Sequence, residues 1–249
     1  KWFAEMFTNQ GHRDNIVRVL KNTFGMSGLN LATSFLPMVF AIFLNEVNNM
    51  RFKKAVQIFT TLPNFISWAL VFSFAMAMFA MDTGIFSKFM LSIGAIQEPV
   101  AWLNSSEHIW LKMWGWSTWK GLGWGAIMYL AAIAGIDQEL YEAAKVDGAN
   151  RWKQILHVTI PCIMPTFILL LIMQIGQLLN CVFDKIYLLQ NTLNLQVSEM
   201  LPTYVYKTGM ISQKYGLATA GGLFNSVISV VLVLIANTIS RKVSETSLF

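Results

Sequence analysis

The sequence predicts an all-α integral membrane protein, a bundle of about five transmembrane helices in this chain. The first observation is composition. Of the 249 residues, 55% are hydrophobic and only 12% are charged, about half the charged fraction of a soluble domain. The second observation is distribution. Four long windows contain no Asp, Glu, Lys or Arg, namely 22–45, 55–81, 158–183 and 215–240. Each window exceeds the roughly 20 apolar residues that cross a bilayer.

Five segments are predicted to span the membrane, with ends set to within about 2–4 residues. They are 16–44, 55–81, 109–136, 160–184 and 214–240. The connections are then 45–54, 82–108, 137–159 and 185–213. One transmembrane domain over 1–249 is the simplest organisation. Because the first residue is Lys1 and not Met, we expect that the chain is trimmed and that a sixth, N-terminal span is missing.

Positive charge predicts the orientation, because Lys and Arg in short loops face the cytoplasm. Two loops, 45–54 and 137–159, and the tail after the last span hold eight of the 18 Lys and Arg residues. They are Arg51, Lys53, Lys54, Lys145, Arg151, Lys153, Arg241 and Lys242. Five spans put all three segments on one side, which is therefore the cytoplasm. Arg18 and Lys21 then sit at the outer end of the first span, where we expect them to snorkel to the interface.

Several functions are excluded by the remaining polar residues. The net charge of +5 does not indicate nucleic-acid binding, because the basic residues cluster at segment ends, where they fit loops and lipid headgroups. The three histidines lie far apart, so no metal site is predicted. The two cysteines, Cys162 and Cys181, fall within one predicted span and are interpreted as packing residues. No nucleophile–base set and no P-loop motif occurs in the sequence, so we expect no enzyme activity.

The loop 137–159 is the longest charged segment. Good helix formers run from Leu140 to Lys145, and Gly148 can end such a helix in a left-handed conformation. Trp152 and Leu156 suggest a second short amphipathic helix. Pro161 follows near the start of the next span, where a missing amide proton costs little. The sequence thus predicts helix, glycine break, helix and membrane, a shape that can dock on another protein; an ordinary solvated loop is the alternative.

The spacing within this loop resembles the EAA loop of ABC importer permeases. Glu142-Ala143-Ala144 is followed after three residues by Gly148, and nine residues later by the tetrapeptide 158–161. Val158 and Ile160 stand where the family pattern has Ile and Leu. The resemblance implies that this loop couples the permease to an ATPase. The coupling residues that it implies are Glu142, Ala143, Ala144, Asp147, Gly148 and Pro161.

The resemblance covers nearly the whole chain. The stretches TTLPNFISW at 60–68, WKGLGWGAIMYLAAIAGI at 119–136 and FDKIYLL at 183–189 are similar to the MalF/MalG-like sugar-permease branch of the binding-protein-dependent family. The last span and the ending SETSLF most resemble the LplB-type permeases of complex oligo- and polysaccharides.

That family implies a type I ABC importer permease fold in a bacterial cytoplasmic membrane, with several spans in the lipid bilayer. Two permease subunits form the pathway, and two ATPase subunits bind ATP and Mg²⁺, while this chain binds no cofactor. Residues 138–149 would insert into a cleft on one ATPase. An extracytoplasmic solute-binding protein would deliver an oligosaccharide, and no nucleic acid takes part.

Polar side chains within predicted spans are candidates for the substrate path, because they are costly in lipid. In the fourth span Gln177, Asn180 and Asp184 share one helical face, and Gln174 lies nearby. Amides and carboxylates suit sugar hydroxyls, although hydrogen bonding between helices explains them as well.

Trp116, Trp119 and Lys120 are further candidates, in the third span. A Trp ring can stack on the apolar face of a sugar, and Lys can bind a hydroxyl or carboxylate group. Interfacial anchoring is the alternative for the tryptophans. Lys120 together with Lys185 would favour an acidic sugar such as a uronate.

Other functions remain open at this point. An importer for another solute class, such as a peptide or amino acid, has the same loop. A secondary transporter would need no ATPase, and an intramembrane enzyme would need paired catalytic side chains that the sequence does not bring together.

Overall fold

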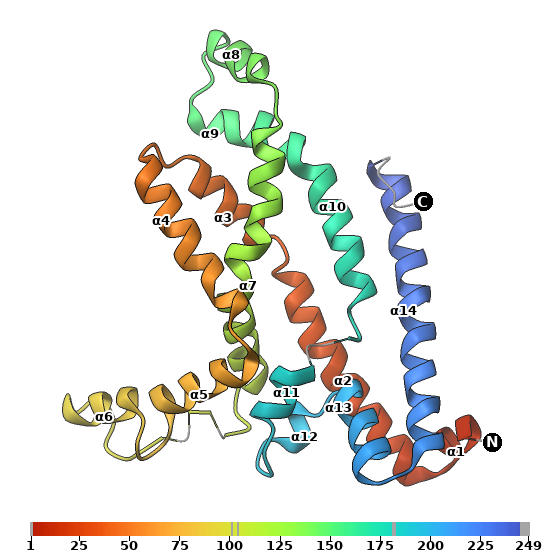
Figure 1. Cartoon of the computed structure of the whole chain (residues 1–249). Helices are drawn as coiled ribbons and strands as arrows, with labels where there is room; N and C mark the ends of the chain where they lie inside the picture. Colours follow the sequence, from red (N-terminus) through yellow and green to blue (C-terminus); the bar gives the residue numbers. More distant parts are fainter. Residues whose placement is uncertain (1, 101, 104, 181–182, 245–249) are drawn as a thin grey trace. The chain divides into compact units, whose positions relative to one another are not determined.

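The computed structural model describes residues 2–100, 102–103, 105–180 and 183–244, and every regular element in these ranges is a helix (Figure 1). The elements in chain order are α1 (Trp2–Thr8), α2 (Gln10–Ala32), α3 (Leu36–Asn45), α4 (Met50–Thr61), the 3₁₀ turn η1 (Leu62–Phe65), α5 (Trp68–Phe79), α6 (Ile85–Ser92), α7 (Ile109–Ala134), α8 (Gln138–Val146), α9 (Arg151–Gln154), the π turn η2 (Ile155–Thr159), α10 (Ile160–Gly176), α11 (Phe183–Leu189), α12 (Leu195–Ser198), α13 (Leu201–Tyr206), the π turn η3 (Lys207–Ile211) and α14 (Tyr215–Ser244).

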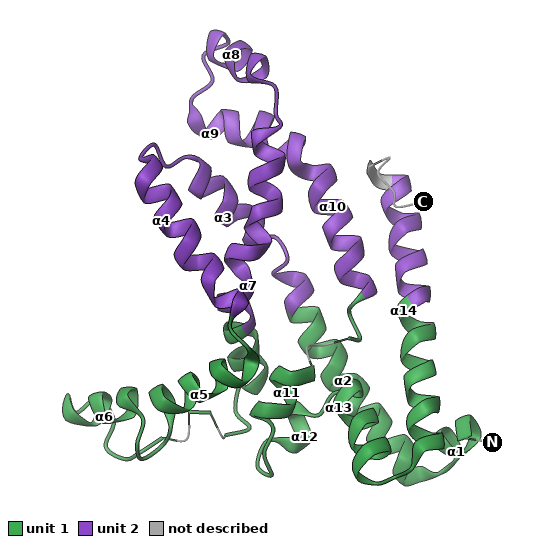
Figure 2. Ribbon diagram, in the orientation of Figure 1, with its two compact units in different colours: residues 1–29, 66–116, 177–229 green, residues 30–65, 117–176, 230–249 purple. Residues whose placement is uncertain are grey.

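The chain forms two compact units, each built from three separate stretches of sequence (Figure 2). Unit 1 comprises 1–29, 66–116 and 177–229, and unit 2 comprises 30–65, 117–176 and 230–249. One core of unit 1 holds Met26, Ile109, Met113, Ile186, Leu189 and Met200. The core of unit 2 holds Met38, Ala41, Ile42, Ala126, Tyr129, Ile133, Ile136, Ile155 and Ile163. The prediction of one domain over the whole chain is not tested by this division and stays a prediction.

The membrane-spanning character of the described helices agrees with the sequence. Three stretches are long and apolar enough to cross a bilayer, namely Gln10–Asn45, Arg151–Gly176 and Tyr215–Lys242. Two further pairs qualify if each bent pair counts as one span, which gives up to five. The third and fifth predicted spans agree with α7 and α14 to within a few residues.

The second predicted span, 55–81, is wrong as a single helix. The helix that begins at Met50 ends at Phe65, and a new helix begins at Trp68. Ser67 causes the restart, because its backbone is extended and its hydroxyl accepts a hydrogen bond from the backbone N–H of Leu70 at 3.3 Å. A serine in this role satisfies a donor that the first turn of a helix leaves unpaired. Hydropathy continues unchanged across the break, so the sequence window passes over it.

The fourth predicted span, 160–184, is wrong at both ends. It begins at Arg151 and continues through η2 into α10, which ends at Gly176. Pro161 was expected near the start of the span, yet it lies within this continuous helix. In η2 the backbone N–H of Ile160 donates to the carbonyl of Ile155, five residues back. This wider turn explains how the helix accommodates a proline, whose ring clashes with the carbonyl four residues earlier in a regular α-helix.

Arg18 does not snorkel as expected but forms an ion pair within unit 1. Its Nη2 atom lies 2.6 Å from Oε2 of Glu199, and Nζ of Lys207 lies 3.4 Å from the other oxygen. The side-chain amide of Asn22 donates to the carbonyls of Gln196 and Glu199. α2 is thereby tied to the segment before α13. The packing role of Cys162 is not supported, since its side chain is exposed, and Cys181 lies outside the described residues.

Candidate functional site

The loop after α7 contains an exposed helix, α8. Asp137 begins it, because its carboxylate accepts a hydrogen bond from the backbone N–H of Glu139 at 3.0 Å. No residue of α8 is buried. Glu142 and Ala143 are exposed and Ala144 is half-buried, while Val146 is 88% exposed. An exposed helix with apolar side chains in a loop is a surface that suits a partner.

Gly148 ends α8 as the sequence predicts. Its φ is +76°, in the left-handed region. The N–H of Ala149 donates to the carbonyl of Ala144 at 2.9 Å, and the N–H of Gly148 donates to that of Lys145 at 3.0 Å. This pair of bonds is a Schellman motif. A Cβ at Gly148 would meet no heavy atom within 4 Å, so backbone conformation and not space favours glycine here. Asp147 is the exposed residue before this turn.

One side-chain contact joins α8 to the helix that follows it, and two others order the turn between them. The carboxamide oxygen of Asn150 accepts from the N–H of Lys153 at 2.9 Å and begins α9. The amide of Gln154 donates to the carbonyl of Ala149 at 2.8 Å. The hydroxyls of Tyr141 and Thr159 share a hydrogen bond of 2.9 Å, which joins α8 to η2. A displacement of α8 would therefore be passed to the continuous helix 151–176, in which Pro161 is exposed.

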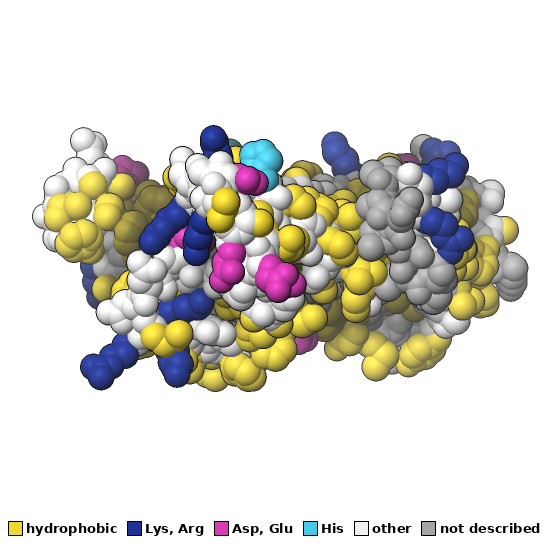
Figure 3. Space-filling view, turned by 90° about the horizontal axis from the view of Figure 1, so that it is seen from above, with side chains coloured by type: hydrophobic (Ala, Val, Ile, Leu, Met, Phe, Trp, Pro, Cys, Tyr) yellow, Lys and Arg dark blue, Asp and Glu magenta, His cyan; other side chains and the backbone are white. Residues whose placement is uncertain are grey.

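The basic segments that set the orientation all belong to unit 2. The start of α4, the segment formed by α8 and α9, and the end of α14 all lie in its stretches of sequence. Lys and Arg side chains gather on the face shown in Figure 3, with Asp and Glu side chains among them. This is the charge distribution that a cytoplasmic surface has.

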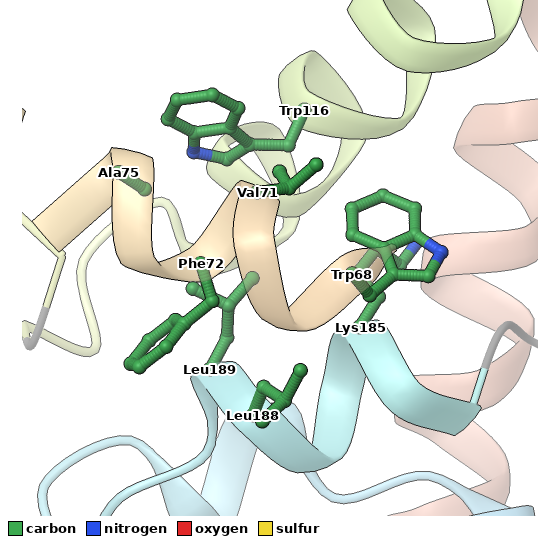
Figure 4. Close-up of a pocket in the computed structure, with 8 residues that line it drawn as sticks. All are labelled: Trp68, Val71, Phe72, Ala75, Trp116, Lys185, Leu188 and Leu189. Carbon is green, nitrogen blue, oxygen red and sulfur yellow. The ribbon is translucent and has the colours of Figure 1, made fainter. Parts of the chain in front are cut away.

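Trp116 lines a small pocket within unit 1 (Figure 4). The lining consists of Trp68, Val71, Phe72 and Ala75 of α5, Trp116 of α7, and Lys185, Leu188 and Leu189 of α11. Its free volume is about 10 Å³, close to the minimum for one water molecule and too small for a sugar ring. Nζ of Lys185 lies 5.9 Å from the centre of the Trp68 ring, within the range of a cation–π contact. In this conformation Trp116 is a packing residue of the pocket wall.

Lys120 and Trp119 lie in unit 2, one buried and one exposed. Lys120 is 8% exposed, and its ammonium donates to the carbonyls of Pro63 at 3.0 Å and Asn64 at 2.7 Å. These carbonyls belong to η1, where the backbone leaves its helical bonding pattern. Trp119 is 43% exposed. A Cβ on Gly123 would overlap the backbone carbonyl of Thr60. α7 and α4 therefore approach closely at Gly123, one turn after Trp119 in the sequence.

The predicted helical face of Gln177, Asn180 and Asp184 does not exist, because α10 ends at Gly176. Asn180 donates to the carboxamide oxygen of Gln177 at 3.3 Å, and Asn225 of α14 donates to that of Asn180 at 2.7 Å. The structure thus brings two of the three together with an asparagine that the sequence reasoning missed. Asp184 lies on a different helix, α11, with its side chain exposed.

Gln174, the fourth polar candidate, belongs to unit 2. Its side-chain amide donates to the carbonyl of Asn30 at 3.2 Å. This is the hydrogen bonding between helices that the sequence left open as the alternative.

Comparison with known proteins identifies the family. Residues 34–245 match the family described as "Binding-protein-dependent transport system inner membrane component". The chain belongs to this family. The permease is 38% identical to Protein LplB of Bacillus subtilis over 249 residues, covering 100% of this chain and 76% of LplB. It is 36% identical over 250 residues to the polygalacturonan/rhamnogalacturonan transport system permease protein YteP of the same organism, again covering 100% and 76% of the two chains.

Solved structures give the same result for the fold. A chain of a bacterial ABC transporter involved in the import of the acidic polysaccharide alginate matches with a TM-score of 0.91 at 36% identity, covering 98% of this permease and 83% of that chain. The predicted family, the all-α type I fold and the role as a permease subunit are confirmed. A secondary transporter is not favoured. None of these comparisons tests the individual site residues, which stay predictions.

Sequence reasoning missed two groups in unit 1 of the permease. Glu199 draws together Arg18 and Lys207, which are distant in sequence. Tyr187 and Tyr206 form an aromatic cluster with Phe183. The sequence signal for this cluster is the spacing of Phe183 and Tyr187, four residues apart in FDKIYLL and so on one face of a helix.

Proposed function

We propose that the chain is one of two homologous permease subunits of an ABC importer in a bacterial cytoplasmic membrane, and that the importer takes up an acidic oligosaccharide. Two separate ATPase subunits would bind ATP and Mg²⁺ and hydrolyse the ATP. An extracytoplasmic binding protein would deliver the substrate. The permease itself would provide the path through the bilayer and bind no cofactor.

One observation carries the coupling role, namely that no residue of α8 is buried and yet the helix is fixed at both ends. Asp137 satisfies its first turn and Gly148 its last. The Tyr141–Thr159 hydrogen bond ties it to η2. In the proposed mechanism α8 sits in a cleft of one ATPase. Closure of the ATPases on ATP shifts α8, and the continuous helix 151–176 tilts with it, so that access to the path alternates between the two sides.

The substrate class is supported by the relatives and not by the geometry of a sugar site. YteP is named for polygalacturonan and rhamnogalacturonan, and the solved transporter for alginate; the named backbones carry carboxylates. In a second solved structure the alginate transporter is in complex with a periplasmic protein that holds an alginate pentasaccharide. A chain of that structure matches this permease with a TM-score of 0.92 at 35% identity, covering 98% of this chain and 84% of that chain. These names support both the acidic substrate and the binding-protein partner.

The test is reconstitution of the assembled importer with its second permease, ATPase and binding protein in proteoliposomes. We expect ATP-dependent uptake of an oligogalacturonate, with little uptake of a neutral maltooligosaccharide of equal length. Uptake that persists when the ATPase subunits are left out would contradict the importer. Preference for the neutral sugar would remove the acidic substrate and leave the importer standing.

A further inference from the structure

α11 has two unlike faces. Lys185, Ile186 and Leu189 are buried in unit 1. The other face presents Phe183 and Tyr187, one turn apart, where side chains on a helix are neighbours. Their rings stack with centroids 5.3 Å apart and an interplanar angle of 15°. The buried face therefore anchors a helix whose outer face holds two parallel rings.

Tyr206 of α13 completes a three-ring surface, which we call the tyrosine platform (Phe183, Tyr187 and Tyr206). Its ring meets that of Phe183 at 5.0 Å and 63°, and that of Tyr187 at 5.5 Å and 78°. These edge-to-face geometries fix the rings relative to one another. Tyr187 nevertheless remains 39% exposed and Tyr206 38% exposed. Within the described part of the chain, neither tyrosine hydroxyl makes a hydrogen bond.

A cation and an amide lie beside the platform, where α11 and α13 meet. Lys207 follows Tyr206 directly, and its ammonium donates to the carboxamide oxygen of Gln190 at 2.5 Å. The same ammonium lies 3.4 Å from Glu199. Gln190 follows α11, and its side-chain nitrogen is buried with no hydrogen-bond partner among the described residues. The Lys207 side chain is 28% exposed, so its charge is fixed in place but still reachable.

We propose that the tyrosine platform binds one ring of the oligosaccharide, as a subsite on the outer side of the permease. This inference rests on the proposed function. The C–H face of a pyranose would stack on the exposed tyrosine rings, and its hydroxyls would pair with the two phenol groups. Lys207 would attract the carboxylate of a uronate.

The polar features favour a sugar over a protein surface as the occupant. A subunit packed flat on the platform would bury two phenol hydroxyls, which costs free energy unless each finds a partner. A sugar ring supplies donors and acceptors around an apolar face. Both helices lie in the segment between α10 and α14, which the distribution of Lys and Arg puts on the outer side. A sugar released by the binding protein would reach this subsite before the membrane path.

The test compares transport with ATP use in the assembled importer, with liganded binding protein at saturation and an oligogalacturonate as substrate. Tyr187→Ala and Tyr206→Ala should lower the number of sugars imported per ATP by about tenfold, the effect of losing about 1.4 kcal/mol of stacking. Their ATPase rates should stay at the wild-type level. Tyr187→Phe and Tyr206→Phe keep the ring but lose the phenol hydrogen bond, so sugars per ATP should fall less than in the alanine variants, by about two- to fivefold. Tyr215→Ala is the matched control, an exposed tyrosine outside the platform.

Each other outcome would overturn the subsite. Unchanged sugars per ATP in both alanine variants means that the platform does not hold sugar. A parallel fall of uptake and ATPase rate would assign the platform to docking of the binding protein. Loss of the second permease from the purified complex would make the platform a subunit interface. If the wild-type importer moves no saccharide at all, the proposed function fails first, and the subsite fails with it.

Discussion

At the scale of single residues, the backbone conformation at position 148 favours glycine over any residue with a side chain. Its φ of +76° costs an L-residue with a side chain about 1–2 kcal/mol, and a β-branched residue more. We therefore predict that Gly148→Val unwinds the end of α8 and lowers ATP-coupled uptake about tenfold, whereas Gly148→Asn stays near wild type because Asn tolerates this region. Uptake per ATP in proteoliposomes measures both. If the valine variant keeps the wild-type uptake per ATP, the last turn of α8 is not needed for coupling.

Glu199 is a second residue with a definite expectation. Removing one partner from a buried ion pair leaves the other charge unmatched, at roughly 3–5 kcal/mol. Arg18 and Lys207 are 24% and 28% exposed, and solvent screening lowers the expected cost of Glu199→Gln to about 2 kcal/mol. We predict a lower thermal unfolding temperature of the purified complex. The control is Glu98→Gln, an exposed glutamate with no ion pair among the described residues. Equal unfolding temperatures for the two variants would contradict a stabilising role for Glu199.

These two residues differ in how far the sequence could predict them. The role of Gly148 is local, because a helix-forming run and the glycine after it lie within a few positions. Glu199 and Arg18 are 181 positions apart. No pattern in a window of sequence connects them, and only the packing of α2 against the segment before α13 brings them together.

At the scale of elements, Lys120 is bound to the end of η1. The carbonyls of Pro63 and Asn64 receive its ammonium, and loss of a donor to a buried carbonyl costs about 1–3 kcal/mol. We predict that Lys120→Met lowers the unfolding temperature of the complex and leaves the ratio of acidic to neutral sugar uptake unchanged. Lys120→Arg keeps a donor and should recover much of the stability. A changed uptake ratio at an unchanged unfolding temperature would place Lys120 on the substrate path instead.

Helix existence was predictable from the sequence, and helix ends were not. α7 and α14 were found because one apolar run corresponds to one helix. The break between Phe65 and Trp68 and the end of α10 at Gly176 occur inside charge-free runs. Hydropathy reports the burial of a segment in lipid and not the direction of its backbone. The face predicted for Gln177, Asn180 and Asp184 failed for this reason, since it assumed a helix that had already ended.

At the scale of the whole molecule, the distribution of positive charge was predictable and the division into units was not. Each unit combines three separated stretches of sequence, so contacts between distant segments define it. The basic loops, in contrast, can be read directly from the sequence, and all of them fall in unit 2. This agreement makes sidedness the property of the molecule that is most directly open to experiment.

The last prediction concerns that sidedness. Val146 in α8 is 88% exposed and Leu193, between α11 and α12, is 71% exposed, so a cysteine at either position is open to a water-soluble reagent. In a background without Cys162 and Cys181, a membrane-impermeant maleimide added to intact cells should label Leu193→Cys and spare Val146→Cys. Cells lysed in a denaturing detergent, which also removes the ATPase subunits from α8, should label both, and this controls for reactivity. Labelling of Val146→Cys in intact cells would place α8 outside the cell, where it cannot contact a cytoplasmic ATPase subunit. That result would contradict the coupling role of this loop.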